Sequence, residues 1–131
     1  MQPTPMRLAS GVLLLLAGAM PAQAQDKPDG DADAGKTVFN RQCAVCHSVQ
    51  AGQNKLGPSL AGILGRHSAE VPGFNYSPAM REANRNWDAE TLNDYLADPR
   101  GKVPGTRMVF PGLRDPRQRA DVIAYLATIT R

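Results

Sequence analysis

The run Cys43-Ala44-Val45-Cys46-His47 carries the most specific chemistry in the sequence. Two thiols at this spacing can add to the two vinyl groups of one haem, which attaches the porphyrin covalently. The adjacent imidazole of His47 then lies under the iron as an axial ligand. The run therefore predicts one haem c, held by thioether bonds to Cys43 and Cys46 and ligated by His47.

Other chemistries of a C-x-x-C pair fit the chain less well. A redox dithiol of the thioredoxin kind needs a βαβ context, and no run in this sequence alternates as a strand. Two cysteines are too few for a four-cysteine zinc site or a disulfide scaffold. An exposed pair in an exported protein would also tend to oxidise, whereas c-type haem is attached outside the cytoplasm.

The second axial ligand of the iron has three candidates outside the N-terminal segment: Met80, Met108 and His67. Met108 lies in a loop bounded by Pro104-Gly105 and Pro111-Gly112, which can press a thioether against a haem face. Met80 follows a helical turn signal, and its side chain is expected to pack in the core. His67 lies in a polar stretch, where an imidazole exposed to solvent is expected. These residues alone leave the choice open.

The N-terminus has the pattern of a secretory signal peptide over residues 1–24. Arg7 precedes an apolar stretch of about 13 residues, and Ala22-Gln23-Ala24 is a small-x-small cleavage site. The apolar stretch is shorter than the ~20 residues that span a bilayer, so cleavage is expected, not anchoring. We then expect an acidic, flexible lead-in at 25–34 and a single haem domain at 35–131.

Composition limits the remaining classes. The 131 residues allow one domain, and 12 Gly with 11 Pro predict a loop-rich fold. A net charge of +3 is too weak and scattered to indicate nucleic acid as a partner. From Gly35 onward the chain has 13 basic and 8 acidic side chains, so the domain itself is basic.

Helical signals occur at three places, with a further turn at Ser77-Pro78. The first helix is capped by Asp31 or Asp33 and runs through Phe39. The second starts at Asp88 and stops before Pro99. The last starts at Asp115, with Pro116 in the first turn and Gln118 completing a capping box, and has Val122, Ile123, Leu126 and Ile129 on one side.

Two long irregular stretches separate these helices, at about 48–76 and 99–114. Such lengths are unusual in a small domain unless something else fills the core. A bound prosthetic group would fill it. The expected class is therefore all-α, with three to five short helices and long loops wrapped around one covalently bound haem.

The chain from Gly30 to Ile129 resembles the class I, mitochondrial-type cytochrome c family, which includes bacterial periplasmic members. The resemblance follows the family's order and spacing of motifs. The matching segments are residues 35–39, 43–47, 56–60, 64–66, 72–76, Trp87, 95–99, 104–110 and 119–126.

The resemblance implies roles for individual residues. It selects Met108 as the sixth ligand, the Pro58 carbonyl as acceptor for the proximal histidine ring, and Tyr95 as the neighbour of the ligand sulfur. It implies that Arg66, Tyr76 and Trp87 hold a haem propionate. The first and last helices should cross at Gly35, Phe39, Val122 and Tyr125.

The sequence departs from the family's usual residues at three positions. Met80 stands where asparagine is frequent, Gln42 replaces a common lysine, and Gly101 replaces another basic residue. The basic side chains left near the expected haem edge are Lys55, Arg100, Lys102, Arg107 and Arg114. Around an exposed haem edge they would steer docking on an acidic partner.

The expected function is soluble one-electron transfer in the periplasm by a monomer that is not an enzyme. Expected partners are redox proteins with acidic surfaces, such as a quinol-cytochrome c reductase, an oxidase, a reaction centre or a dehydrogenase, without nucleic acid or stable membrane insertion. One alternative is an electron-entry subunit of a periplasmic dehydrogenase or oxidase. Another is a peroxidase or gas-binding haem protein, which would need an open sixth site that Met108 opposes.

Overall fold

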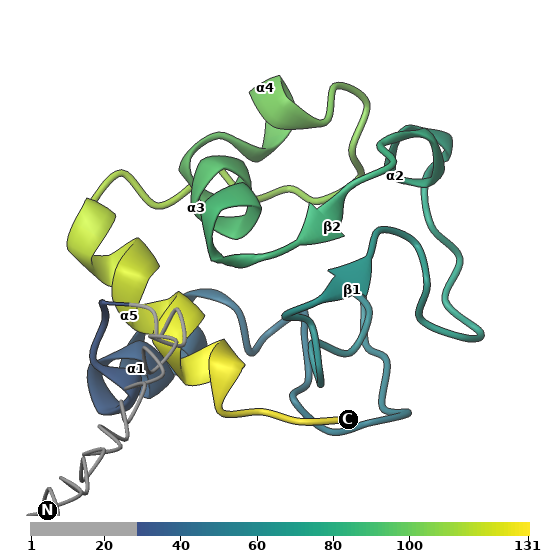
Figure 1. Cartoon of the computed structure of the whole chain (residues 1–131). Coiled ribbons are helices and arrows are strands. Elements are labelled where there is room, and N and C mark those ends of the chain that lie inside the picture. The colour runs from purple at the N-terminus through teal and green to yellow at the C-terminus, as the bar shows by residue number, and fades with distance from the viewer. Residues whose placement is uncertain (1–28) are drawn as a thin grey trace, which may run out of the picture.

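The computed structural model describes residues 29–131, and the expected signal peptide lies outside them. Helices dominate this part of the chain, joined by long loops (Figure 1). The elements are α1 (Ala32–Gln42), β1 (Arg66–His67), α2 (Pro78–Glu82), β2 (Asn86–Trp87), α3 (Ala89–Ala97), α4 (Pro99–Lys102) and α5 (Pro116–Ala127). No helix among residues 29–131 is long and apolar enough to cross a membrane.

The first and last helices of the described chain, α1 and α5, pack against each other (Figure 1). Gly35 lies so close to α5 that a Cβ atom there would collide with the carbonyl oxygen of Asp121. Beside this contact the rings of Phe39 and Tyr125 pack with centroids 5.6 Å apart. The predicted crossing of the first and last helices is confirmed, and only glycine permits an approach this close.

The boundary of the acidic lead-in differs from the prediction of 25–34. Asp31 is the N-cap of α1, and its carboxylate accepts from the N–H groups of Asp33 and Ala34 at 2.9 and 3.1 Å. The Asp31 N–H donates to the Asp121 carboxylate at 2.8 Å. Residues 31–34 therefore belong to the folded domain, because Asp31, one of the two predicted cap residues, starts the first helix and bonds Asp121 on the last one.

The α3 helix begins as predicted, at Asp88, and carries a capping box. The Asp88 carboxylate accepts from the Thr91 N–H at 2.8 Å, while the Asp88 N–H donates to the Thr91 hydroxyl at 2.9 Å. The capping box predicted for α5 is wrong. There, Asp115 accepts from the Arg117 N–H at 2.8 Å and Gln118 is exposed to solvent, so a single N-cap bond starts the helix.

Three short elements, β1, β2 and α4, were not predicted from the sequence. β1 pairs antiparallel with β2, Arg66 opposite Trp87, and two-residue strands are too short to produce an alternating pattern. The α4 helix follows α3 directly, inside a stretch expected to be irregular. Asp98 ends α3 and caps α4 by accepting from the Gly101 N–H at 2.9 Å, and Pro99 occupies the first helical position.

Candidate functional site

The C-x-x-C-H run forms one tight turn at the C-terminal end of α1. The Cys43 N–H donates to the Phe39 carbonyl at 2.8 Å, and the His47 N–H donates to the Cys43 carbonyl at 2.9 Å. Neither cysteine is in a disulfide bond. Burial, with a smaller contribution from neighbouring Cys46, raises the pKa of the Cys43 thiol to about 11. The turn thus brings the two cysteine side chains and the imidazole together on one short segment.

The His47 ring is fixed by the backbone of Pro58, as the resemblance implies. Nδ1 lies 2.8 Å from the Pro58 carbonyl oxygen. Because a carbonyl only accepts, Nδ1 carries the proton and the lone pair is left on Nε2. Burial lowers the pKa of this imidazole, so the ring is neutral at neutral pH. A neutral, oriented imidazole with a free Nε2 is the form that binds a metal.

Gly57 contributes to this ring position, a role that the sequence reasoning did not assign. A Cβ atom at Gly57 would collide with the His47 imidazole. The only available signal was its place in the Leu56-Gly57-Pro58 segment, next to the carbonyl acceptor. The His47 ring is therefore held by the hydrogen bond to the Pro58 carbonyl and by contact with the backbone of Gly57, where only glycine leaves room for it.

Met108 is held by Tyr95 on α3. The Tyr95 hydroxyl donates to the Met108 sulfur at 3.4 Å, and the Met108 N–H donates to the Thr106 hydroxyl at 3.3 Å. Tyr95 is buried and packs on Trp87 with ring centroids 5.1 Å apart. Burial raises the pKa of the Tyr95 phenol, so it remains a proton donor at neutral pH. The thioether is thus oriented, with lone-pair capacity for one more partner.

The other two candidates for the sixth ligand occupy different surroundings. Met80 lies on α2 and packs against the hydrophobic core, as Met108 also does, but among residues 29–131 only the Met108 sulfur accepts a hydrogen bond. His67 on β1 has Nε2 at 2.9 Å from the Asn84 side-chain oxygen and Nδ1 at 3.1 Å from the Ser68 carbonyl. Both ring nitrogens already face oxygen atoms, and no nitrogen is left for iron.

Arg66, Tyr76 and Trp87 are all buried, and the pairing of β1 with β2 brings Arg66 opposite Trp87. The Arg66 guanidinium donates to the carbonyl oxygens of Ala61 and Ser59, at 3.0 and 3.1 Å. Both carbonyl groups are neutral. The buried guanidinium is therefore hydrogen-bonded, but neither partner balances its positive charge. A buried cation of this kind fits an anionic carboxylate such as a haem propionate.

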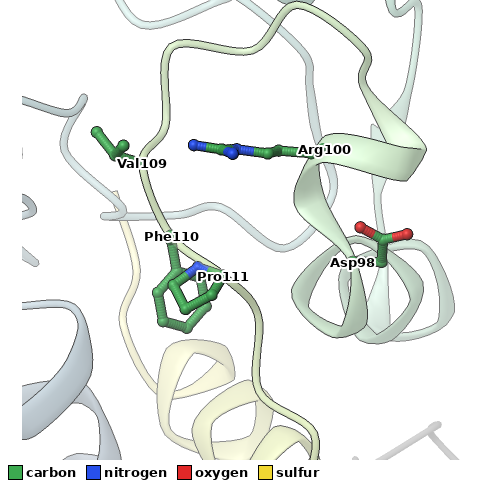
Figure 2. A pocket seen from close by; sticks show the side chains of 5 residues that line it. All are labelled: Asp98, Arg100, Val109, Phe110 and Pro111. Carbon is green, nitrogen blue, oxygen red and sulfur yellow. The ribbon is translucent and has the colours of Figure 1, made fainter.

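A surface pocket of about 310 Å³ lies on the Met108 side of the molecule. It is lined by Asp98, Arg100, Val109, Phe110 and Pro111. Figure 2 shows Arg100 extending from α4 toward the loop that carries Val109. A cationic side chain therefore lies beside the residues that directly follow Met108.

Comparison with known proteins finds relatives that cover most of the chain. The cytochrome c family model matches residues 32–130. A cytochrome c2 from Blastochloris viridis is 43% identical over 121 residues, covering 92% of this chain and 91% of the relative. A cytochrome c2 from Rhodopila globiformis is 47% identical over 102 residues, covering 78% of this chain and 96% of the relative. A cytochrome c from Guizotia abyssinica is 46% identical over 106 residues, covering 80% and 96%.

The match spans nearly all of the described chain, the helical architecture agrees with the family's fold, and the two cysteines are present at the turn that ends α1. The function that follows from the match is electron transfer and not enzymatic catalysis. The chain belongs to the cytochrome c family, as an electron-transfer protein that carries a covalently attached haem c.

Proposed function

We propose that this chain is an exported one-electron carrier of the periplasm whose haem iron is ligated by His47 and Met108. One observation carries the ligand assignment. Each of these two side chains is oriented by a second group, the Pro58 carbonyl at 2.8 Å from His47 Nδ1 and the Tyr95 hydroxyl at 3.4 Å from the Met108 sulfur. A histidine and methionine pair is the axial set typical of electron-transfer cytochromes c.

The bound haem supplies one iron that alternates between the ferrous and ferric states. The chain's own residues decide how easily that happens. Pro58 keeps the proton on His47 Nδ1 and increases the basicity of Nε2. Tyr95 withdraws electron density from the Met108 sulfur, which makes this ligand a weaker donor and favours the ferrous state. Arg66, Tyr76 and Trp87 are proposed to hold a propionate inside the protein.

The proposed docking surface combines basic and apolar side chains near these residues. Lys55, Arg100, Lys102, Arg107 and Arg114 are exposed. The three exposed large apolar side chains are Val45 between the cysteines, Leu56 next to Gly57, and Val109 next to Met108, among residues 29–131. This composition suits acidic redox partners of the reductase, oxidase, reaction-centre or dehydrogenase classes, because charge steers the encounter and apolar contacts hold the short-lived complex.

The proposed periplasmic location rests on the N-terminal sequence. Residues 1–24 have a basic residue, a short apolar stretch and a small-x-small cleavage site. The bacterial relatives named cytochrome c2 are similar over most of the chain. Export would also bring Cys43 and Cys46 to the compartment in which c-type haem is attached.

Expression of the full chain in a bacterium that matures c-type cytochromes tests this proposal. We expect a coloured protein in the osmotic-shock fraction, starting at Gln25 by N-terminal sequencing, whose haem stays on the chain in acid–acetone and in denaturing electrophoresis. A Cys43→Ala, Cys46→Ala double variant should lose the haem, whereas Ser48→Ala should keep it. Haem extracted from the unaltered protein by acid–acetone would contradict covalent attachment, and protein retained in the cytoplasm would contradict export.

A further inference from the structure

Arg85 precedes β2, and its backbone and side chain are both fixed. Its N–H donates to the Ser68 hydroxyl at 3.0 Å, and its carbonyl accepts from the Ser68 N–H at 2.7 Å. The guanidinium Nη2 donates to the Lys102 carbonyl oxygen at 2.8 Å. The side chain is partly buried, and its Nε atom is fully buried with no hydrogen-bond partner among residues 29–131. The cation is thus held in one place inside the structure.

The charge of Arg85 is not balanced by an ion pair. Within residues 29–131, ion pairs closer than 4.0 Å join Lys102 to Asp94 and Arg117 to Asp121. A pocket of about 170 Å³ next to Arg85 is lined by one carboxylate, Glu82, and by a second cation, Lys102. Glu82 is exposed, so solvent screens its charge more than that of the partly buried guanidinium.

The position of this charge connects it to the Met108 side of the proposed haem site. Lys102, whose carbonyl binds Arg85, ends α4 and begins the loop that leads to Met108. Arg85 also lies two residues before Trp87 of β2, whose ring packs on Tyr95 with centroids 5.1 Å apart. Tyr95 is the residue whose hydroxyl donates to the Met108 sulfur. Arg85 is therefore fixed next to both the loop that carries the proposed ligand and the segment that packs on its donor.

Resting on the proposed His47 and Met108 ligation, we propose that Arg85 is a positioning and charge-bearing residue that raises the reduction potential of the haem. The ferric site carries one more positive charge than the ferrous site, and a fixed cation nearby disfavours the more positive state. Because the charge is partly buried and has no ion-pair partner among residues 29–131, solvent screens it less than a fully exposed charge. Nothing in the sequence pattern singled out Arg85, which lies in the polar run Arg81 to Asn86.

The test compares the midpoint potentials of three holoprotein variants with the unaltered protein. Arg85→Met keeps the length of the side chain and removes the charge, and we expect the equilibrium constant for reduction to fall roughly tenfold, which is about 59 mV for one electron. Arg85→Lys keeps the charge and should recover most of this loss. The control Lys36→Gln removes an exposed charge from α1 and should change the equilibrium constant by less than about twofold.

The inference is wrong if Arg85→Met and Lys36→Gln shift the midpoint potential equally. It is also wrong if the potential of Arg85→Lys is as low as that of Arg85→Met. If Arg85→Met does not yield holoprotein, Arg85→Gln replaces it. This variant also removes the charge but keeps a polar side chain, so it should lower the potential, and an unchanged or higher potential contradicts the inference. The sulfur-to-iron absorption band is recorded in each protein. Its absence from the unaltered protein would contradict the ligation itself, whereas its presence with an unmoved potential would contradict only the role of Arg85.

Discussion

Both proposed iron-facing side chains depend on groups that are distant in the sequence. His47 is oriented by a carbonyl 11 residues away, and Met108 by a hydroxyl 13 residues away. The C-x-x-C-H run predicted His47 from its own spacing. No local pattern marks Pro58 as an acceptor, because every residue has a carbonyl, and that role came from the family resemblance. No local pattern marks the contact of Gly57 with the ring either, because it arises only when the chain folds.

Tyr95→Phe tests the hydrogen bond to the Met108 sulfur. Loss of the hydroxyl removes a donor that competes with iron for sulfur electrons, so the ferric state gains stability. The net worth of such a bond is about 1 kcal/mol, and we expect the midpoint potential to fall by tens of millivolts in a potentiometric titration. Tyr125→Phe at the α1–α5 contact is the matched control and should leave the potential unchanged. Equal potentials in the two variants would show that Tyr95 only fills space.

At the scale of elements, cap residues predicted the starts of helices better than the spacing of apolar residues did. The Asp88 signal placed the start of α3 correctly. The Asp98-Pro99 pair has the same form, yet α4 was missed because its four residues are too short to show a periodic face. At Asp115 the N-cap was right but the partner was wrong, since the carboxylate bonds the second helical N–H and Gln118 stays in solvent. Cap residues predict where a helix starts, but not which donors they satisfy.

Asp88→Asn tests the cap of α3 through its pH dependence. The Thr91 backbone N–H lowers the pKa of Asp88 below its usual value of 3.8. A lowered folded-state pKa means that the carboxylate stabilises the fold above pH 3.8 and loses this contribution as the pH falls through the lower folded value.

Thermal unfolding followed by circular dichroism measures the effect. Asparagine keeps an acceptor but does not titrate, so the variant should unfold at a lower temperature than the unaltered protein near pH 6, and the difference should shrink on acidification. Lys36→Gln, which removes no carboxylate, should retain the acid dependence of the unaltered protein. A difference that stays constant down to pH 2.5 would argue against the ionised cap.

For the whole molecule, the long segment between α1 and α2 provides residues of the proposed haem site. From a segment with little regular structure it supplies Pro58, which binds the His47 ring, and the buried side chains of Arg66 and Tyr76, which we propose hold a propionate. The sequence predicted that a prosthetic group must complete so loop-rich a fold, and the family match confirms a covalent haem. The pairing of β1 with β2, and the place of Arg85 next to it, could not be predicted. They depend on contacts between residues about 20 apart with no periodic signal.

The basic surface should make electron exchange with anions depend on salt. Exposed charges are screened over a Debye length of about 8 Å at 0.15 M salt, so the rate of oxidation by hexacyanoferrate(III) in a stopped-flow instrument should fall as ionic strength rises. Charge reversal at Arg100 and Arg107 should flatten this dependence, mainly through the association rate. Lys36→Glu on α1 should preserve it. A rate that is constant or rises with salt would show that these basic side chains do not steer anions and are only an ordinary solvated surface.

The central claim, that His47 and Met108 together ligate the iron of an electron carrier, is tested most directly by the red-edge sulfur-to-iron absorption band of the ferric protein. The account predicts this weak band in the unaltered protein and in Met80→Ala, and its loss in Met108→Ala together with a lower potential, because water enters the vacated position. A band that survives in Met108→Ala, or that disappears in Met80→Ala instead, would contradict the assignment.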